Sequence, residues 1–407
     1  MPLFYFFYLS KTAEYIGLTL TFFILVFWLC LSGQSIASQQ SDPTQEKFVG
    51  DFLEYWGSAR LLLAGKNPYS PEQLLEVQRS VVGNKKGPTI MWNPPWTLFF
   101  LIPFGLLSFS TGQLLWLMLN AASLLVCSAH LWRIYGGPPG RYRIAWLICF
   151  SVVPTYGILY MMQITPLVLA GIVGFLHFQE RKQWWLAGTV LVLIAIKPHL
   201  AYIFWLALLL WVLEKRQWRV ILGGVISGMI ITIIPLLFVS DLFGYYFQAY
   251  LADTALTPFN WATPTLSNAL LLLFGLDNVW VRLVPPIGSL VWFLLYWRKQ
   301  RNNWIWTEQM PLILLLSQAT TVFAWTYDQI LLLPALMQVA IWSTSGGPRK
   351  IISVAFIAFL LINLPTLLVL NGVLIPNGFW LFWMVPVFLL AYSMFHIQIT
   401  TAIRARS

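Results

Sequence analysis

Long runs of apolar residues, separated by short polar or basic segments, dominate the chain. Such runs cover about residues 16–31, 114–133, 219–239 and 279–297. A helix needs about 20 mostly apolar residues to cross roughly 30 Å of hydrocarbon. Because the runs are continuous and do not alternate with polar residues, they predict membrane-spanning α-helices and not the strands of a β-barrel.

Composition supports an all-α polytopic membrane protein. The 407 residues are 59% hydrophobic and 9% charged, with a mean hydropathy of +0.73, whereas a soluble domain is about a quarter charged. The net charge of +10 comes mostly from short Lys and Arg clusters between the runs, and no basic face carries base-stacking aromatics, so no nucleic acid is expected as a partner. The cysteines Cys30, Cys127 and Cys149 show no metal spacing and no disulfide framework.

The basic clusters predict the topology, because cytoplasmic loops are enriched in Lys and Arg. Counting back from the basic C-terminus gives about twelve crossings, with both termini in the cytoplasm. The chain is then one integral membrane domain, residues 1–407, whose largest outer segments are 34–93 and 240–278. The proline-rich stretch 94–108 is predicted to be interfacial or re-entrant.

The first run, residues 16–31, has two interpretations. Ser35-Ile36-Ala37 resembles the cleavage site of a signal peptide. The run is longer than the apolar part of a typical signal peptide, and the chain stays hydrophobic after it, so a retained span is favoured.

Two pairs of apolar runs are too short for ordinary spans and meet at polar tips. Irregular backbone at membrane depth is tolerated only where it lines protein or a water-filled cavity. We therefore expect hairpins of short helices whose tips stop inside the outer leaflet. The pairs are 144–160 and 166–179, which meet at Met162-Gln163-Ile164-Thr165-Pro166, and 186–196 and 200–213, which meet at Lys197-Pro198-His199.

Residues 51–63 predict an amphipathic helix lying on the membrane. Asp51 at its start is either a charge that favours the helix dipole or a general base whose pKa is raised at a dry membrane edge. Glu54, one turn later, is an alternative base or a solvated charge. The apolar positions recur every three or four residues: Phe52, Tyr55, Trp56, Ala59 and Leu63.

Cations at membrane depth are candidate phosphate ligands. Lys197 lies between two apolar runs, and an ionisable residue there is a functional hypothesis by default. With His199 it could bind a phosphate or pyrophosphate oxygen, or it could snorkel to the outer surface. Arg282, near the outer end of 279–297, could contact a lipid phosphate, although anchoring to headgroups is favoured.

The remaining polar tips are candidate hydroxyl ligands. Gln163 and Thr165 could bind a sugar hydroxyl or only satisfy a helix break. In Tyr327-Asp328-Gln329, Asp328 could bind hydroxyls or form a structural ion pair with Lys197. The aromatic, proline-rich patch 92–96 could stack on sugar rings, but interfacial belt residues are the favoured interpretation.

An ordered set of these motifs resembles glycosyltransferase family 87, whose members are GT-C-type integral membrane enzymes. They include mycobacterial mannosyltransferases that use polyprenyl-phosphate-mannose. The resemblance covers roughly residues 15–340. Its motifs are Asp51-Phe52-x-x-Tyr55-Trp56, Leu63-x-Gly65-x-Asn67-Pro68-Tyr69, Pro94-Pro95 with Pro103, Gln163, Lys197-Pro198 and Tyr327-Asp328.

The resemblance implies a function. The family's first-loop aspartate matches Asp51, which becomes the expected catalytic base. A sugar, mannose or another hexose, would move from a polyprenyl-phosphate donor to a lipid or glycan hydroxyl with inversion, outside the bacterial plasma membrane. Lys197 is inferred to bind the donor phosphate, and neither a metal nor another cofactor is expected. The expected substrate-binding residues are Glu54, Arg60, Gln163, Lys197, His199, Tyr327 and Asp328.

The chain departs from the family pattern at three positions. Asn93 replaces a tyrosine before the paired prolines, and Met162 replaces a glycine before the tip glutamine. Ala324-Trp325-Thr326 stands where a histidine often introduces the Tyr-Asp tip, so any role of that histidine is lost or passes to His199. These changes bear on the identity of the sugar and the acceptor.

Two other classes compete with an enzyme. A transporter or flippase of lipid-linked sugars would also use broken helices and a buried lysine, but no inverted repeat is evident and the polar tips cluster on one side. A non-catalytic membrane scaffold would need neither Asp51 nor Lys197.

Overall fold

The computed structural model describes residues 49–252, 261–275, 279–344, 363 and 381–393. Regular structure in these residues is helical, without a strand. The first apolar run (16–31) lies outside the described residues, and of the apolar stretch 351–370 only Asn363 is described.

Four helical segments in the described part are long and apolar enough to cross a membrane. A fifth arises if α6 and α7, which are bent by 71° at their junction, form one broken span. The prediction of membrane-spanning helices is thus supported, while the number of about twelve crossings stays a prediction. The segments are α5 (Phe109–Ile134), η2 with α11 (Pro198–Lys215), α12 (Trp218–Leu236), Trp280–Asn303 around α15 (Val284–Gln300), and the pair α6 (Tyr142–Ser151) and α7 (Val153–Met161).

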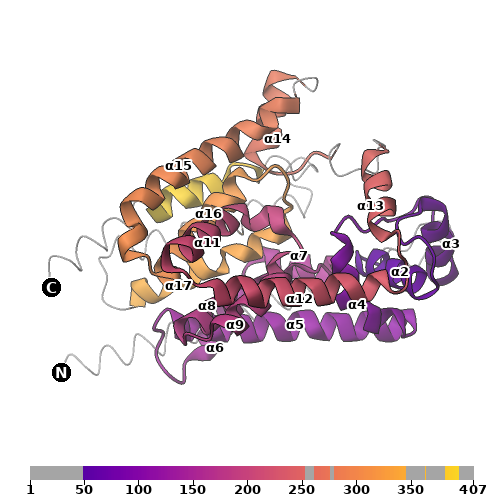
Figure 1. Cartoon of the computed structure of the whole chain (residues 1–407), viewed down its shortest axis with the longest axis horizontal. Coiled ribbons are helices and arrows are strands. Elements are labelled where there is room, and N and C mark those ends of the chain that lie inside the picture. Colours follow the sequence, from indigo (N-terminus) through magenta and orange to yellow (C-terminus); the bar gives the residue numbers. More distant parts are fainter. Residues whose placement is uncertain (1–48, 253–260, 276–278, 345–362, 364–380, 394–407) are drawn as a thin grey trace.

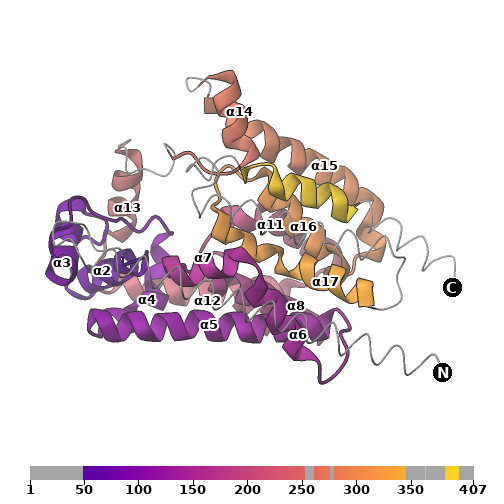
Figure 2. The same cartoon turned by 180° about the vertical axis from the view of Figure 1, so that it is seen from behind.

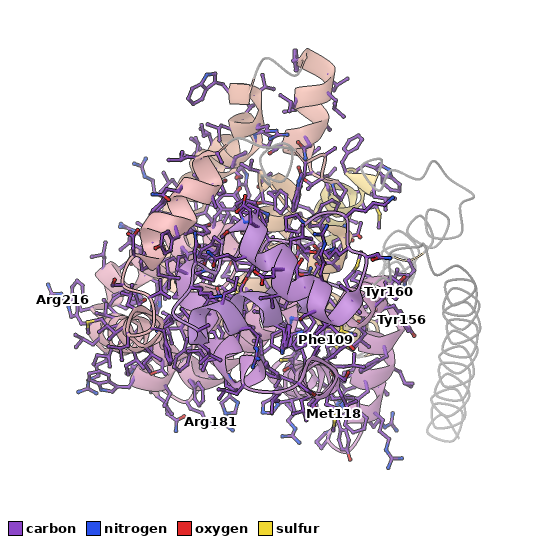
Figure 3. All side chains as sticks on the ribbon, turned by 90° about the vertical axis from the view of Figure 1, so that its right-hand side faces the viewer. Phe109, Met118, Tyr156, Tyr160, Arg181 and Arg216 are labelled. Atoms are coloured by element: carbon purple, nitrogen blue, oxygen red, sulfur yellow. The ribbon has the colours of Figure 1, made fainter. Side chains whose placement is uncertain are left out.

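The basic connections between the helices gather at one end of the molecule, on the left in Figure 1. They follow α5, α8 (Thr165–Glu180), α11 and α15. The opposite end holds α2 (Phe52–Leu63), α3 (Pro71–Val82) and α13 (Leu242–Leu251), and Figure 2 shows the same separation from behind. Figure 3 views the molecule from the α2 end and shows Tyr156 and Tyr160 of α7 on the side opposite Arg216.

The predicted helix at 51–63 is present as α2, but its environment differs from the prediction. Nine of its 12 residues are buried, including Tyr55 and Ala59, so it does not lie on the membrane with one exposed face. The cause is cover from α3, α4 (Leu98–Gly105) and α5. The approach to α4 is close, because a Cβ on Gly105 would lie 2.8 Å from the Cβ of Ala59.

The proline-rich stretch 94–108 forms only short helices, as predicted for a segment that does not cross. The 3-10 helix η1 (Pro95–Thr97) runs into α4, and their combined stretch Pro95–Gly105 is shorter than a span. The turn after α4 is fixed to α2, since the Trp56 indole donates to the Leu107 carbonyl over 3.1 Å.

The predicted helix breaks are present. Met162 ends α7 in the left-handed conformation, with φ 56°, and α8 follows after Gln163 and Ile164. At the second tip the chain leaves the short helix α10 (Leu191–Ile194) and turns through η2 (Pro198–Ala201) into α11 (Tyr202–Lys215). A third break, which includes η6 (Thr326–Leu332), separates α16 (Trp306–Thr320) from α17 (Leu333–Thr344).

The remaining helices complete the bundle. The helix α9 packs on α12 through glycines: a Cβ on Gly188 would lie 2.1 Å from the Val220 carbonyl oxygen. The other elements are α9 (Trp184–Thr189), α14 (Leu266–Phe274), η4 (Val279–Leu283), η5 (Arg301–Asn303), α16 (Trp306–Thr320), η6 (Thr326–Leu332) and α17 (Leu333–Thr344).

Candidate functional site

A cavity of about 630 Å³ lies where the three helix breaks meet α2, α13 and η4. Most of its wall is apolar or aromatic, with a few charged and amide groups, as is usual for ligand pockets. Its polar and charged lining residues are Asp51, Glu54, Tyr55, Thr89, Asn93, Gln163, Lys197, His199, Tyr202, Tyr246, Tyr250, Arg282, Thr321 and Tyr327.

The backbone of Asp51, at the start of α2, is hydrogen-bonded to Met161, the last residue of α7. Its backbone N–H donates to the Met161 carbonyl over 2.7 Å. The preceding Gly50 has φ +67°, and a Cβ there would lie 2.8 Å from the same oxygen, so only glycine allows this approach. The contact places the carboxylate of Asp51 at the cavity wall beside the tip of the α7–α8 break.

Gln163 links Asp51 to the second tip. Its Nε2 donates to Oδ2 of Asp51, while its Oε1 accepts from Lys197 Nζ over 2.9 Å and from the Tyr55 hydroxyl over 3.3 Å. The backbone carbonyl of Gln163 accepts from Nδ2 of Asn120 over 3.0 Å. These contacts fix the side-chain amide so that its N–H₂ group faces the carboxylate of Asp51.

Lys197 makes three hydrogen bonds inside the protein. Its ammonium donates to Gln163 Oε1, to Thr165 Oγ1 over 3.1 Å and to Asp328 Oδ1 over 2.8 Å. The Tyr327 ring lies against it, with Nζ 5.2 Å from the ring centroid. Lys197 is buried. Its side chain therefore does not snorkel to the outer surface, which was one of the two interpretations of the sequence.

Asp328 lies behind the cavity wall and not on it. Its Oδ1 also accepts from the Thr165 hydroxyl over 2.7 Å, and its Oδ2 accepts from the backbone N–H of Trp325 over 3.0 Å. The side chain is 1% exposed. Of the two sequence interpretations, the ion pair with Lys197 is therefore present, and hydroxyl binding by Asp328 is not supported.

The two carboxylates on the wall differ in their tendency to ionise. Burial raises the pKa of Asp51 to about 6, although the charge of Lys197 and the hydrogen bond from Gln163 act in the opposite direction. Burial, and then the negative charge of Asp51, raise the pKa of Glu54 well above its usual value. Environments that separate two pKa values assign roles: with a pKa of about 6, Asp51 is mostly ionised at neutral pH, whereas burial favours the protonated form of Glu54, which can donate a hydrogen bond.

Aromatic side chains form two walls of the cavity. One wall carries Trp92, Tyr246 and Tyr250, with the rings of Trp92 and Tyr250 6.2 Å apart. In the other, the Trp261 ring lies 6.0 Å from that of Phe323 and 6.2 Å from that of Trp325. Aromatic faces are well suited to stack on sugar rings or isoprenoid chains.

Two predicted residues have different placements. His199 lines the cavity, its ring 5.9 Å from that of Phe323, and its carbonyl accepts from the Thr321 hydroxyl over 3.1 Å. Arg60 lies outside the cavity: its Nη1 donates to the Gly105 carbonyl over 3.2 Å, and its guanidinium lies 5.6 Å from the Trp56 ring centroid. The structure thus gives Arg60 a contact between α2 and α4 and no contact with the site.

Sequence reasoning missed several lining residues. Tyr202, Tyr246, Tyr250 and Trp261 sit in ordinary aromatic-rich segments, and nothing in their spacing distinguishes them from belt or core residues. Asn93 was noted in the sequence only because it replaces the tyrosine that usually precedes the paired prolines. In the structure its Nδ2 donates to the Ile196 carbonyl over 3.3 Å, which connects the proline-rich segment to the second tip. Among the described residues no group of three or more His, Cys, Asp or Glu side chains is arranged to hold a metal.

The sequence of this chain is similar to those of known proteins. The family model of Glycosyltransferase family 87 matches residues 92–323. Two curated proteins, each named alpha-(1->3)-arabinofuranosyltransferase, from Mycobacterium tuberculosis strains CDC 1551 and H37Rv, are each 25% identical over 266 residues, covering 61% of this chain and 58% of their own length. The chain thus spans somewhat more than half the length of these relatives, and no solved structure matches it. Because the family model covers more than half of the chain, this protein belongs to glycosyltransferase family 87.

Proposed function

We propose that the protein is a membrane glycosyltransferase that moves a sugar from a polyprenyl-phosphate donor to a hydroxyl of a lipid or glycan, with Asp51 as general base. The observation that carries the proposal is the carboxylate of Asp51, held by Gln163 at the wall of a cavity of about 630 Å³. A base whose pKa is about 6 is mostly ionised at neutral pH yet still basic enough to accept a hydroxyl proton.

The reaction balances with one carboxylate. The acceptor oxygen bonds to the anomeric carbon, the bond from that carbon to the phosphate oxygen breaks, and the acceptor proton goes to Asp51. The lipid phosphate leaves as a stable anion and needs no proton, in contrast to the leaving groups of glycosidases, which use a carboxylate pair. A single displacement from the opposite face inverts the anomeric centre.

The other polar residues of the site either position Asp51 or contact the substrates. Lys197 holds Gln163, which orients Asp51, and Asp328 holds Lys197. Burial favours the protonated form of Glu54, which is suited to donate to a sugar or acceptor hydroxyl. Tyr327 and His199 line the cavity, where they can contact the sugar.

The topology supports a lipid-linked donor. The positive-inside rule favours a cytoplasmic location for the end that carries the basic connections. The cavity is lined by α2 and α13, which lie at the other end of the molecule. A site on the extracytoplasmic side is separated from cytoplasmic nucleotide sugars. A polyprenyl phosphate already lies in the membrane and can present its sugar there.

The observations suggest two alternative sugars for the donor. The motif resemblance suggests mannose or another hexose, and the names of the relatives suggest arabinofuranose. Membranes that contain wild type or Asp51→Asn are given polyprenyl-phosphate-[¹⁴C]mannose or polyprenyl-phosphate-[¹⁴C]arabinofuranose. Label in extracted glycolipids or glycans that requires Asp51 supports the proposal and identifies the sugar. Equal transfer by the Asp51→Asn variant would refute the role of the base.

A further inference from the structure

A second buried cation lines the same cavity. Arg282, in η4 just before α15, is 6% exposed and contributes to the cavity wall with Pro286. An arginine that only anchored the helix to lipid headgroups would extend its charged end into the interface. The burial of Arg282 at the cavity wall therefore does not fit a headgroup anchor, and it places the charge of Arg282 beside the space that a ligand would occupy.

Lys197, the other candidate for the donor phosphate, is already committed. An ammonium group has three protons to donate, and the three acceptors Gln163, Thr165 and Asp328 take them. The carboxylate of Asp328 also balances the charge of Lys197 at 2.8 Å. To bind a phosphate, Lys197 would have to give up bonds that orient Asp51.

The surroundings of Arg282 suit a lipid ligand. It lies near the start of the candidate span Trp280–Asn303, at the depth where a phosphate of a membrane lipid is expected. The neighbouring Trp280 is 80% exposed, and Val284 and Ile287 are more than half exposed. These apolar side chains form a membrane-facing surface beside the cavity, so a lipid phosphate can reach Arg282 while its chain stays in the membrane.

The helix that carries Arg282 is fixed to the catalytic tips. The Tyr202 hydroxyl, at the start of α11, hydrogen-bonds Ser289 of α15, and Tyr202 and Pro286 both line the cavity. Since η2 and α11 are continuous, this contact holds the outer end of α15 at a set distance from Lys197 and His199. Arg282 is thereby positioned relative to Asp51 across one cavity.

We propose that Arg282 binds the phosphate of the lipid-linked donor, and that Lys197 is a positioning residue. A guanidinium can grip two phosphate oxygens at once. It would stabilise the charge that grows on the phosphate as the bond to the anomeric carbon breaks. This inference rests on the proposed lipid-phosphate donor, and it assigns a phosphate ligand that the motif comparison did not.

Direct binding tests the assignment without turnover. The full chain, purified in detergent, is titrated with farnesyl phosphate and with farnesol by microscale thermophoresis. We expect wild type to prefer farnesyl phosphate, and Arg282→Met to bind it about tenfold or more weakly while farnesol binding stays the same. Arg282→Lys should recover part of the affinity. Arg298→Met, an exposed arginine at the other end of α15, is the matched control and should bind as wild type does.

The double variant Lys197→Met/Asp328→Asn removes the buried pair together. It should keep the preference for farnesyl phosphate although transfer is impaired. If Arg282→Met keeps the wild-type preference, or loses farnesyl phosphate and farnesol equally, the assignment of Arg282 is overturned and the proposed function stands. If wild type itself shows no preference for farnesyl phosphate over farnesol, the proposal of a lipid-phosphate donor is refuted as well.

Discussion

Nζ of Lys197 lies 2.8 Å from Oδ1 of Asp328, with the two side chains 11% and 1% exposed. These residues are 131 positions apart and belong to different helix breaks. Their pairing joins the second and third tips behind the cavity, and through Gln163 it also reaches the first tip and Asp51. The site is therefore one hydrogen-bonded unit with a charge pair at its base.

Removing one member of this pair should destabilise the protein. Lys197→Met leaves the carboxylate of Asp328 buried without its counter-ion, which typically costs about 3–5 kcal/mol. The melting temperature of the detergent-purified protein should fall clearly. The double variant Lys197→Met/Asp328→Asn removes both charges of the pair and should recover most of the loss. If the single and double variants melted alike, the pair would not carry this role.

Replacing Asp51 with asparagine should abolish transfer without loss of stability. Asparagine cannot accept the acceptor proton, so label incorporation should fall by about two to four orders of magnitude. The pKa of Asp51 is raised from 3.8 to about 6, so the folded state disfavours its ionised form, and this cost appears as pH rises through that window. At pH 7 the neutral variant should melt at or above the wild-type temperature. A variant that melts lower would show that the carboxylate stabilises the fold.

Glu54→Gln is the control for this experiment. Burial favours the protonated form of Glu54, and glutamine keeps a hydrogen-bond donor at the same place. The variant should retain a large part of the transfer activity and mainly raise KM. Complete loss of kcat in Glu54→Gln would make Glu54, and not Asp51, the base.

The activity should depend on pH through Asp51. Its pKa of about 6 means that the base is available above this pH and is lost by protonation below it. With wild-type protein, kcat/KM should fall about tenfold per pH unit below pH 6 and level off above it. Initial rates between pH 5 and 8 measure this, with melting curves at each pH to exclude unfolding. A rate that stays flat down to pH 5 would contradict the role of Asp51.

The sequence identified the helix breaks because their chemistry is unusual for a membrane segment. Gln163 and Lys197 stand between apolar runs. A polar group at membrane depth is costly, so it points to a functional site. The family motifs added the order of the tips along the chain. Five of the eight predicted site residues, Asp51, Gln163, Lys197, Tyr327 and Asp328, are joined by direct contacts in the structure.

Other features depended on packing that no local pattern records. The apolar spacing of α2 is that of a one-sided helix, and the cover by α3 and α4 became visible only in the fold. Arg60 lies in the same helix, but its Nη1 donates to the carbonyl of Gly105 instead of reaching the cavity. Arg282 looked like a headgroup anchor because the sequence cannot show that η4 closes one wall of the cavity.

The packing of α9 on α12 gives a prediction about stability alone. A Cβ on Gly188 would lie 2.1 Å from the Val220 carbonyl oxygen, and one on Gly223 would lie 2.4 Å from the Trp185 carbonyl oxygen. Close glycine contacts of this kind hold membrane helices together. Gly188→Val should therefore lower the melting temperature strongly. Gly228, on the partner helix α12, would have no atom within 4 Å of its Cβ, so Gly228→Val should be tolerated. Equal effects of the two variants would place the glycine contact in doubt.

The contact of Gly50 with Met161 gives a prediction about activity. A Cβ at Gly50 would lie 2.8 Å from the Met161 carbonyl oxygen, which accepts the backbone N–H of Asp51. Gly50→Ala must therefore shift the start of α2 away from α7 and carry the carboxylate of Asp51 away from Gln163. We expect kcat to fall about a hundredfold, since a displacement of about 1 Å at a catalytic group has that effect.

Gly65→Ala separates this displacement from backbone strain. Gly65 has φ +68°, almost the same as the φ +67° of Gly50, but the nearest atom to its Cβ would be 3.8 Å away. Alanine in the left-handed region costs about 1–2 kcal/mol at either position, so both variants should lose at least this much stability, and Gly50→Ala should lose more because of its contact with Met161. Only Gly50→Ala should also lose kcat. If the two variants lost kcat equally, the Gly50–Met161 contact would not be what positions the base.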